Sequence, residues 1–480
     1  MSTLDDLQKN RIEKLEKIRL LGIDPYPATF NRKQTNNQAL KRSGEEVSVA
    51  GRLRGIRGHG GSTFADLVDE SGKIQLFFSK QELNEKDFEL LKLLDLGDFI
   101  GVKGEVFKTQ AGEITVKVSS LTILTKTILP LPGKWHGLVD IETRLRKRYL
   151  DLIMNPEVRE MFVKKSKFWQ AVRDYLCKKG FLEVETPVLE TIPGGADARP
   201  FITHHNALDI DLYLRISLEL HLKRLIVGGY EKVFEIGRVF RNEGIDAEHL
   251  QDYTMLEFYW AYADYNDLMV MLEDLYKYLV KETLGTMKSS YHGQEIDWSG
   301  KWPKFDYSEI FEKLTGLDPV KAGVEELYNK AQELKLRPEK NLGKGRLIDL
   351  IYKNTVRPTL IQPCFLINSP VEISPLAKRH PDKPELTQRL HIMAGGTELC
   401  NAFSELNDPI DQKQRFENQQ KLREAGDEEA QMYDTDFVEA LEYGMPPTAG
   451  VGISERLFAF LMDKPIRETI FFPPIRTLHS

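Results

Sequence analysis

Two arginines in well-separated segments are suited to chemistry on charged substrates. Arg241 begins the segment RNEGIDAEHLQDYTMLE (241–257), which joins strand-like runs at 232–240 and 253–262, and Arg456 ends the segment GVGISER (450–456). Arginine carries a planar fork of donors that can bridge a carboxylate and a phosphate at once. The two segments therefore indicate a site for anionic reactants, although either arginine alone could belong to a surface ion pair.

The composition is typical of a globular protein with two or three domains. The chain has 480 residues, 41% of them hydrophobic and 29% charged, which is too long for one ordinary core. It has no apolar run of about 18 residues and no signal-peptide pattern, so we expect a cytoplasmic protein without a membrane partner. Its three cysteines (Cys177, Cys364 and Cys400) lie far apart, which argues against structural zinc and a disulfide framework.

The charge is unevenly distributed along the chain. The formal net charge is −7, yet residues 1–60 hold 12 Lys and Arg against 7 Asp and Glu. A basic end on an acidic body fits a protein that binds phosphates locally, and it fits a solvated terminal helix almost as well.

The N-terminal part has the element order of an OB-fold. An apolar stripe predicts a helix at 4–21, and a polar connector follows. Period-two runs then predict strands at 47–53, 63–68, 73–78, 99–107 and 113–124, with a helix at 86–96 between the third and the fourth. We therefore expect a basic helix and connector (1–45), an all-β OB-fold barrel (46–128) and a linker (129–143).

The remainder, 144–480, is expected to be one α+β domain. A long helix-like run at 144–180 leads into a strand and Pro187. Irregular loops and long helices separate the later strands, without regular βαβ units, which predicts a mainly antiparallel sheet with helices around it. The stretch 284–342 carries no motif and is interpreted as an insertion.

Several segments together resemble one family, the class II lysyl-tRNA synthetases of the bacterial type. Residues 181–187, 241–257 and 450–456 are similar to motifs 1, 2 and 3 of class II synthetases. The discriminating segments are IPGGADARPFITHHN (192–206), LRISLEL (214–220), CNAFSELNDP (400–409) and GMPPTAG (444–450). They follow the family's order and approximate spacing, and the resemblance covers almost the whole chain.

The resemblance implies a lysine–tRNA ligase. Such an enzyme activates L-lysine with ATP to lysyl-adenylate and transfers lysine to the 3′ end of tRNA(Lys), releasing AMP and pyrophosphate. It also implies Mg²⁺ and a homodimer formed through motif 1. Both reactants of the first step are anionic, so catalysis rests on positioning and electrostatic stabilisation, without a general base.

The family's ATP contacts carry over to matching positions of this chain. Arg241 would bridge the amino-acid carboxylate and the α-phosphate, and Arg456 would hold the γ-phosphate; these two are the expected catalytic residues. Adenine would stack on Tyr253, with Arg456 against its other face. Glu398 would bind the Mg²⁺. The expected ATP-binding residues are Arg241, Glu243, His249, Tyr253, Glu398 and Arg456.

Carboxylates carry the expected choice of amino acid. An ammonium needs an anionic acceptor when it is buried, and Glu405 matches the family's ε-ammonium partner, with Tyr259 adding a hydroxyl. Glu405 could instead be structural. A pocket of this kind rejects ornithine only weakly, because one methylene is worth about 1–3 kcal/mol. The expected lysine-binding residues are Gly195, Glu219, Arg241, Glu257, Tyr259, Asn401, Phe403 and Glu405.

In the OB-like part, Arg57, Phe64 and Gln75 match the family's anticodon contacts. Phe64 could stack on an unpaired base, while Arg57 and Gln75 could read its edge. The alternative is that Phe64 belongs to the barrel core.

Three departures from the family pattern stand out. His391 occupies the position of a second acidic residue, and imidazole is a poor magnesium ligand. Glu248 replaces an arginine of the motif 2 loop, where an acid would repel phosphate. Motif 3 is one residue shorter before Glu455 and Arg456.

Three other functions stay open. An aspartyl- or asparaginyl-tRNA synthetase shares the architecture, but Glu405 with Tyr259 fits a short acidic or amide side chain badly. An enzyme that lysylates elongation factor P resembles the catalytic half and lacks the OB-like part. An inactive paralogue that binds tRNA or ATP would account for the three departures.

Overall fold

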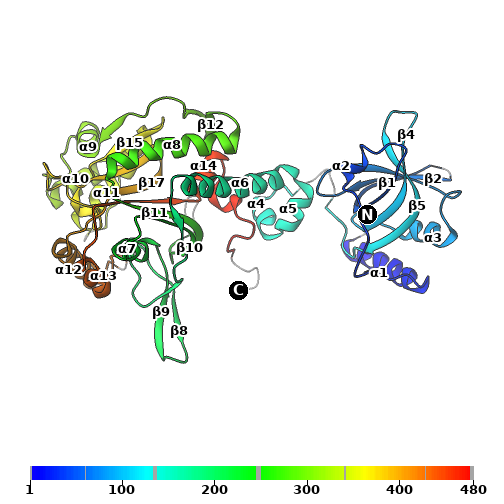
Figure 1. Cartoon of the computed structure of the whole chain (residues 1–480), viewed down its shortest axis with the longest axis horizontal. Coiled ribbons are helices and arrows are strands. Elements are labelled where there is room, and N and C mark those ends of the chain that lie inside the picture. Colours follow the sequence, from blue (N-terminus) through cyan, green and yellow to red (C-terminus); the bar gives the residue numbers. More distant parts are fainter. Residues whose placement is uncertain are drawn as a thin grey trace. The chain divides into compact units, whose positions relative to one another are not determined.

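The computed structural model describes residues 3–59, 61–132, 138–244, 250–339, 342–427 and 429–475, apart from the side chain of His59. The chain forms two compact units, Met1–Arg144 and Leu145–Ser480 (Figure 1). Each unit has its own hydrophobic core. Within the described ranges, no helix is long and apolar enough to cross a membrane.

The first unit is a closed barrel with the strand order β1-β2-β3-β5-β4, which confirms the predicted OB-fold. Its strands pair antiparallel except β3 with β5. In β3, residues Ile74, Leu76 and Phe78 are buried, while Gln75 and Phe77 point to the other face. The elements are α1 (Leu4–Leu20), α2 (Asn36–Ala39), β1 (Glu46–His59), β2 (Ser62–Val68), β3 (Lys73–Ser79), α3 (Glu85–Leu93), β4 (Phe99–Lys108) and β5 (Ile114–Thr125).

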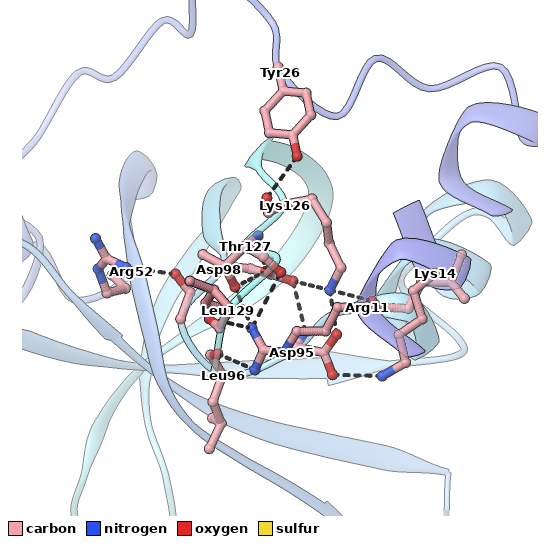
Figure 2. A network of polar contacts seen from close by, with 12 residues as sticks. Arg11, Lys14, Tyr26, Arg52, Asp95, Leu96, Asp98, Lys126, Thr127 and Leu129 are labelled. Carbon is pink, nitrogen blue, oxygen red and sulfur yellow. Dashed lines mark hydrogen bonds and ion pairs between the residues drawn. The ribbon is translucent and has the colours of Figure 1, made fainter. Parts of the chain in front are cut away.

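A buried polar network joins α1 to one end of the barrel (Figure 2). Arg11 of α1 donates to the hydroxyl of Thr127 (2.6 Å), just beyond β5. The side chain of Lys126 is fully buried and donates to Asp98 (2.8 Å) and to Asp95. Since Arg11 is buried and Lys14 of α1 pairs with Asp95 (2.6 Å), this network fixes the N-terminal helix against the barrel.

The second unit is built on a mixed sheet with the order β14-β15-β16-β17-β18-β11-β10-β6. Neighbours from β15 to β10 are antiparallel, as predicted. The edge strands β14 and β6 run parallel to their neighbours, because helical crossovers join each to its partner strand. The strands are β6 (Leu182–Glu183), β10 (Lys232–Phe240), β11 (Asp252–Ala261), β14 (Lys304–Asp306), β15 (Cys364–Ile367), β16 (Arg389–Ala394), β17 (Thr397–Ser404) and β18 (Thr448–Ser454).

Helices cover both faces of this sheet (Figure 1). On one face, α6 (Pro156–Lys178) and α8 (Tyr265–Leu284) pack through the main core. On the other face, α7 (Glu219–Val227), α12 (Pro409–Glu424) and α13 (Thr435–Glu442) pack through a second core. Residues along β11 therefore alternate between the two cores, and those that face α7 line the candidate site.

Smaller elements complete the second unit. One small sheet has the order β7-β9-β8, and β12 pairs with β13. These strands are β7 (Leu189–Glu190), β8 (Ile202–His205), β9 (Ile210–Leu214), β12 (Lys288–Tyr291) and β13 (Gln294–Asp297). The other helices are α9 (Tyr307–Thr315), α10 (Val324–Glu333), α11 (Lys344–Thr355) and α14 (Arg456–Leu461), with 3-10 turns at Arg357–Thr359, Val371–Ile373 and Ile466–Thr469.

The prediction of one continuous helix at 144–180 was wrong. The chain forms α4 (Ile141–Arg146), α5 (Arg148–Met154) and α6 in succession. Asn155 has extended dihedral angles (φ −119°, ψ 90°) directly before Pro156. Proline disfavours the helical conformation of the residue before it and is well suited to the first helical position, so α6 begins there.

The stretch 284–342, interpreted above as an insertion, contributes to the framework of the second unit. It supplies the edge strand β14 and the β12–β13 hairpin. Trp298 and Trp302 from this stretch are buried in the main core. Their burial shows that the stretch stabilises the same core as α6 and α8.

Candidate active site

Two glycines of β18 let side chains of the neighbouring strands approach one another over the centre of the sheet. In the strand register, Gly450 lies between Tyr259 of β11 and Phe403 of β17, and Gly452 lies between Glu257 and Asn401. A methyl group added at Gly450 would collide with the carboxylate of Glu405 and the ring of Tyr259. Since the glycines have no side chains, functional groups from the strands on either side come together above β18.

Glu257 is a buried carboxylate in this group of side chains. It accepts hydrogen bonds from the Ser217 hydroxyl (2.7 Å), from the Leu218 amide (2.9 Å) and from the Tyr259 hydroxyl (2.9 Å). Burial and the nearby charge of Glu219 raise the pKa of Glu257 to about 7, against the lowering effect of these hydrogen bonds. The group is therefore poised to lose a proton when a cation arrives.

Two further carboxylates, those of Glu219 and Glu405, share one buried cation. Lys223 donates to Glu219 (2.6 Å), four residues earlier on α7, and forms an ion pair with Glu405. Burial raises the pKa of Glu405 well above its usual value, an effect that the charge of Lys223 opposes. Glu405 follows β17 directly, where its amide donates to the Thr448 carbonyl (2.8 Å).

The loop at Gly195 packs against Ser217 and Glu219, beside these carboxylates. Gly195 has φ +84°, and a methyl group there would strike Ser217 and Glu219. Only glycine adopts this conformation without strain. The main chain at Gly195 therefore lies against the carboxylate cluster, as the expected lysine-binding role requires.

The two sequence-predicted arginines lie near one aromatic ring. The Arg241 guanidinium is 5.6 Å from the centre of the Tyr253 ring. Burial raises the pKa of the Tyr253 hydroxyl, while the charges of Arg241 and Arg456 lower it, so both arginines act on this residue. Stacking of adenine between Tyr253 and Arg456 stays a prediction.

A buried carboxylate holds the segment that carries Arg456. Glu455 is fully buried, accepts from the Thr254 amide (3.0 Å) and forms an ion pair with Lys165 of α6. The Glu455 amide donates to the Thr254 carbonyl (3.0 Å). These contacts fix the turn from β18 to α14, so the shortened motif 3 is anchored on β11 and α6.

Glu398 is the candidate magnesium ligand. Its carboxylate lies 3.2 Å from Nδ1 of His391. Although burial alone would raise it, the pKa of Glu398 is lowered to about 2 by His391 and by the charges of Arg389 and Arg456. Within the described residues, no group of three or more His, Cys, Asp or Glu could hold a metal ion. One ionised carboxylate suffices for a Mg²⁺ that also binds phosphate oxygens and water, whereas His391 does not fit it.

The remaining predicted residues are placed as follows. The Glu243 amide donates to the Arg241 carbonyl (2.9 Å). Asn401 accepts from the Arg389 guanidinium (2.8 Å), and the ring of Phe403 is buried 5.5 Å from the Lys223 ammonium. Two positions, Glu248 and His249, lie outside the described residues.

The predicted anticodon residues gather on the outer face of the barrel. Arg57, Phe64 and Phe77 lie opposite one another on β1, β2 and β3. Phe64 is partly exposed, so it does not belong to the barrel core, and its ring is 5.0 Å from that of Phe77. Arg57 donates to both oxygens of Asp66 (2.8 and 3.1 Å), which lies opposite Gln75.

Comparison with known proteins assigns the chain to a family. Residues 140–476 match the family model described as tRNA synthetases class II (D, K and N), and residues 47–124 match the model described as OB-fold nucleic acid binding domain. The chain belongs to the class II tRNA synthetases. It is 50% identical over 479 residues to the lysine–tRNA ligase of Moorella thermoacetica and 47% identical over 487 residues to that of Bacillus subtilis. Both alignments cover 98% of this chain and 98% of the relative.

The sequence did not identify three residues of this synthetase that the structure brings to its sites. They are Lys223 between the carboxylates, Lys165 behind motif 3 and Phe77 beside Phe64. A spacing of four residues on a helix places Glu219 and Lys223 on one face, so that pair was open to prediction. The contact between Lys165 and Glu455 joins residues 290 positions apart and leaves no local signal.

Proposed function

We propose that this chain is a lysine–tRNA ligase that makes lysyl-adenylate and then lysyl-tRNA(Lys). The similarity to lysine–tRNA ligases over 98% of the chain supports the activity. The observation that carries the choice of substrate is the buried carboxylate of Glu405, with Glu257 and Tyr259 beside it. A pocket of this charge favours a cationic amino acid and disfavours an aspartate or asparagine side chain.

In the proposed first step, a carboxylate oxygen of lysine attacks the α-phosphorus of ATP. A bond forms between this oxygen and the α-phosphorus. The bond from the α-phosphorus to the oxygen that bridges to the β-phosphate breaks, and pyrophosphate leaves with the electron pair of the broken bond. Arg241 holds the lysine carboxylate against the α-phosphate, and Arg456 holds the γ-phosphate. In the second step, a hydroxyl oxygen of the terminal ribose of the tRNA attacks the lysyl carbonyl, the hydroxyl proton passes to a phosphate oxygen of the adenylate, and AMP leaves.

The proposed substrate contacts follow from the positions of the side chains around β18. Glu405 accepts the ε-ammonium of lysine, while Glu219, Glu257 and the main chain at Gly195 receive the α-ammonium. Glu243 and Tyr253 belong to the ATP side of the site. Mg²⁺ bound through Glu398 would neutralise charge on the phosphates.

We further propose that the outer face of the barrel binds the anticodon of tRNA(Lys). Phe64 and Phe77 form an aromatic surface for base stacking, and Arg57 and Gln75 lie at its borders. Base stacking on aromatic rings contributes about 1–3 kcal/mol per base. Since tRNA charging serves translation, the proposal places the enzyme in the cytoplasm.

A homodimer is proposed through the region that follows α6. Several large apolar side chains are exposed there on short strands, among them Leu182 (48% exposed), Leu189 (46%) and Ile202 (64%). Exposed apolar patches of this kind mark association surfaces, and a two-fold interface is the most frequent arrangement.

The decisive experiment is ATP–pyrophosphate exchange with each of the twenty amino acids. Exchange with lysine alone, abolished in Arg241→Ala, is the expected result. Exchange with aspartate or asparagine would overturn the assignment of Glu405. No exchange with any amino acid would favour an inactive paralogue.

A further inference from the structure

Lys223 places a cation inside the pocket that the proposed function reserves for ammonium groups of the substrate. Its side chain is completely buried. Its ammonium contacts Glu219 and Glu405, and it lies 5.5 Å and 5.8 Å from the ring centres of Phe403 and Phe437. No step of the proposed reaction uses this ammonium, although a buried lysine is costly unless it is fully paired.

A count of charges in the pocket indicates what Lys223 does. Three buried carboxylates, those of Glu219, Glu257 and Glu405, face one another, and Lys223 is the cation bonded to two of them. The hydroxyl of Tyr259 is neutral, because burial and these carboxylates raise its pKa further. Lysine would bring two ammonium groups, which together with Lys223 match the three carboxylates one to one.

Arg389 is the other cation that acts on this cluster, from β16. Burial raises the pKa of Glu219, and the charges of Lys223 and Arg389 oppose that rise. The donors of Arg389, however, go to Asn401 (2.8 Å), to the Ser374 hydroxyl (3.1 Å) and to the Ile373 carbonyl. Arg389 is therefore held at the border of the pocket, and the balance among the three carboxylates depends on Lys223.

Lys223 also leaves one carboxylate oxygen open. Neither oxygen of Glu405 has a partner with hydrogen-bond geometry among the described residues, but Oε2 forms the ion pair with Lys223, which leaves Oε1 buried without a partner there. A buried carboxylate oxygen without a donor is an unfavourable arrangement that an incoming ammonium corrects. The Lys223 ammonium thus orients Glu405 with one oxygen available to the substrate.

We propose that Lys223 is a positioning residue for substrate choice: its fixed ammonium neutralises one of three pocket carboxylates, so that an amino acid with two ammonium groups completes the charge balance. The inference rests on the proposed function and deepens it, because it defines the substrate class by charge. An amino acid with a neutral side chain would leave one buried carboxylate without a cation. Lys223 acts through Glu405 and Glu219 and takes no part in the reaction itself.

Removal of the Lys223 charge should weaken the binding of lysine in a pH-dependent way. With methionine at this position, Glu219, Glu257 and Glu405 would share a dry pocket without their common cation. Mutual repulsion would then keep one of them protonated near neutral pH, and a protonated carboxyl group does not balance an ammonium. Lysine binding should weaken, and the defect should shrink as rising pH ionises the last carboxyl group.

The test is steady-state ATP–pyrophosphate exchange by wild-type protein and by Lys223→Met at pH values of about 6.5, 7.5 and 8.5. The loss of one charge-assisted pair should raise the KM for lysine about 10- to 100-fold at the lowest pH. The kcat and the KM for ATP should stay within about threefold, and the ratio of the two lysine KM values should fall several-fold by the highest pH. Lys223→Arg, which keeps the charge, should recover part of the loss.

Two further variants separate charge balance from packing. Lys277→Met removes a lysine that pairs with Glu273 at the same four-residue spacing (2.6 Å) on α8, and it should leave the lysine KM unchanged. In Glu219→Gln/Lys223→Met one carboxylate and one cation are lost together. Lys223→Met should therefore raise the lysine KM less in the Glu219→Gln background than alone.

Three results would overturn the inference while leaving lysine activation intact. One is an unchanged or lowered lysine KM in Lys223→Met, which would mean that Lys223 competes with the substrate. Another is a loss that is independent of pH and equal for lysine and ATP, which would indicate a structural role only. The third is full additivity in the double variant. If Lys223→Met does not fold, the Arg and double variants still decide the question. Wild-type protein without lysine-dependent exchange would overturn the proposed function itself.

Discussion

At the scale of single residues, the absence of a side chain at Gly450 is a functional feature. An added methyl group would meet the Glu405 carboxylate and the Tyr259 ring, which are both held in place. We expect Gly450→Ala to lower kcat/KM for lysine about 100-fold or more, since the pocket must distort to accept the methyl group. Gly452→Ala is the matched control, because its methyl group would meet mainly the flexible end of Met255. Equal losses in the two variants would contradict this account.

Glu257 gives lysine binding a defined pH dependence. In the free protein its pKa is raised to about 7, so the carboxyl group is largely protonated below that pH. An ammonium of lysine favours the ionised form, which means that binding releases a proton and the affinity rises with pH between about 5 and 7. Calorimetry in buffers of different ionisation enthalpy should show release of up to about one proton near pH 6.5, and Glu257→Gln should abolish it. Proton uptake would contradict the assignment.

Sequence reasoning predicted which residues gather around β18 better than it predicted how they are paired. Glu257, Tyr259 and Glu405 were named from their motifs, and the structure gathers them around β18. The sequence could not show that a lysine of the protein already occupies part of the carboxylate cluster. That fact depends on α7 packing over the sheet, which turns Lys223 inward.

At the scale of elements, α6 supports the turn that carries Arg456, a proposed ATP contact, from the opposite face of the sheet. Lys165 pairs with Glu455 and donates to the Thr469 carbonyl (2.8 Å). Lys165→Met should leave Glu455 buried without its cation, loosen the turn before Arg456, and raise the KM for ATP about tenfold while the KM for lysine stays unchanged. Exchange assays with one substrate varied at a time would measure this, and a rise confined to the lysine KM would refute it.

The ends of the helices and strands were harder to predict than their types. The structure has β10, β11 and the barrel strands β2 to β5 within a residue or two of the predicted ends, whereas β1 continues to His59 instead of ending at residue 53. The run 144–180 was interpreted as one long helix-like stretch, which left the effect of Pro156 on the preceding residue out of account. The stretch 284–342 has no motif, and its place in the main core depends on Trp298 and Trp302, which periodicity alone could not place.

At the scale of the whole molecule, the proposed function divides amino-acid activation and tRNA recognition between the two compact units. All the proposed lysine and ATP contacts that the structure describes belong to the second unit, and the proposed anticodon contacts belong to the first. The two half-reactions should therefore respond to different substitutions. On the proposed function, activation of lysine depends on the second unit alone, whereas charging of tRNA(Lys) depends on both units.

Phe64→Ala and Phe77→Ala test this division. Each removes one ring of an aromatic pair whose centres are 5.0 Å apart on the outer face of the barrel. The loss of a stacking partner should raise the KM for tRNA(Lys) about 10- to 100-fold in aminoacylation and leave ATP–pyrophosphate exchange unchanged. Ala65→Gly alters the neighbouring position, which faces the barrel core, and should change stability but not the preference for a lysine anticodon. If both phenylalanine variants charge tRNA(Lys) as the wild type does, this face of the barrel does not bind the anticodon.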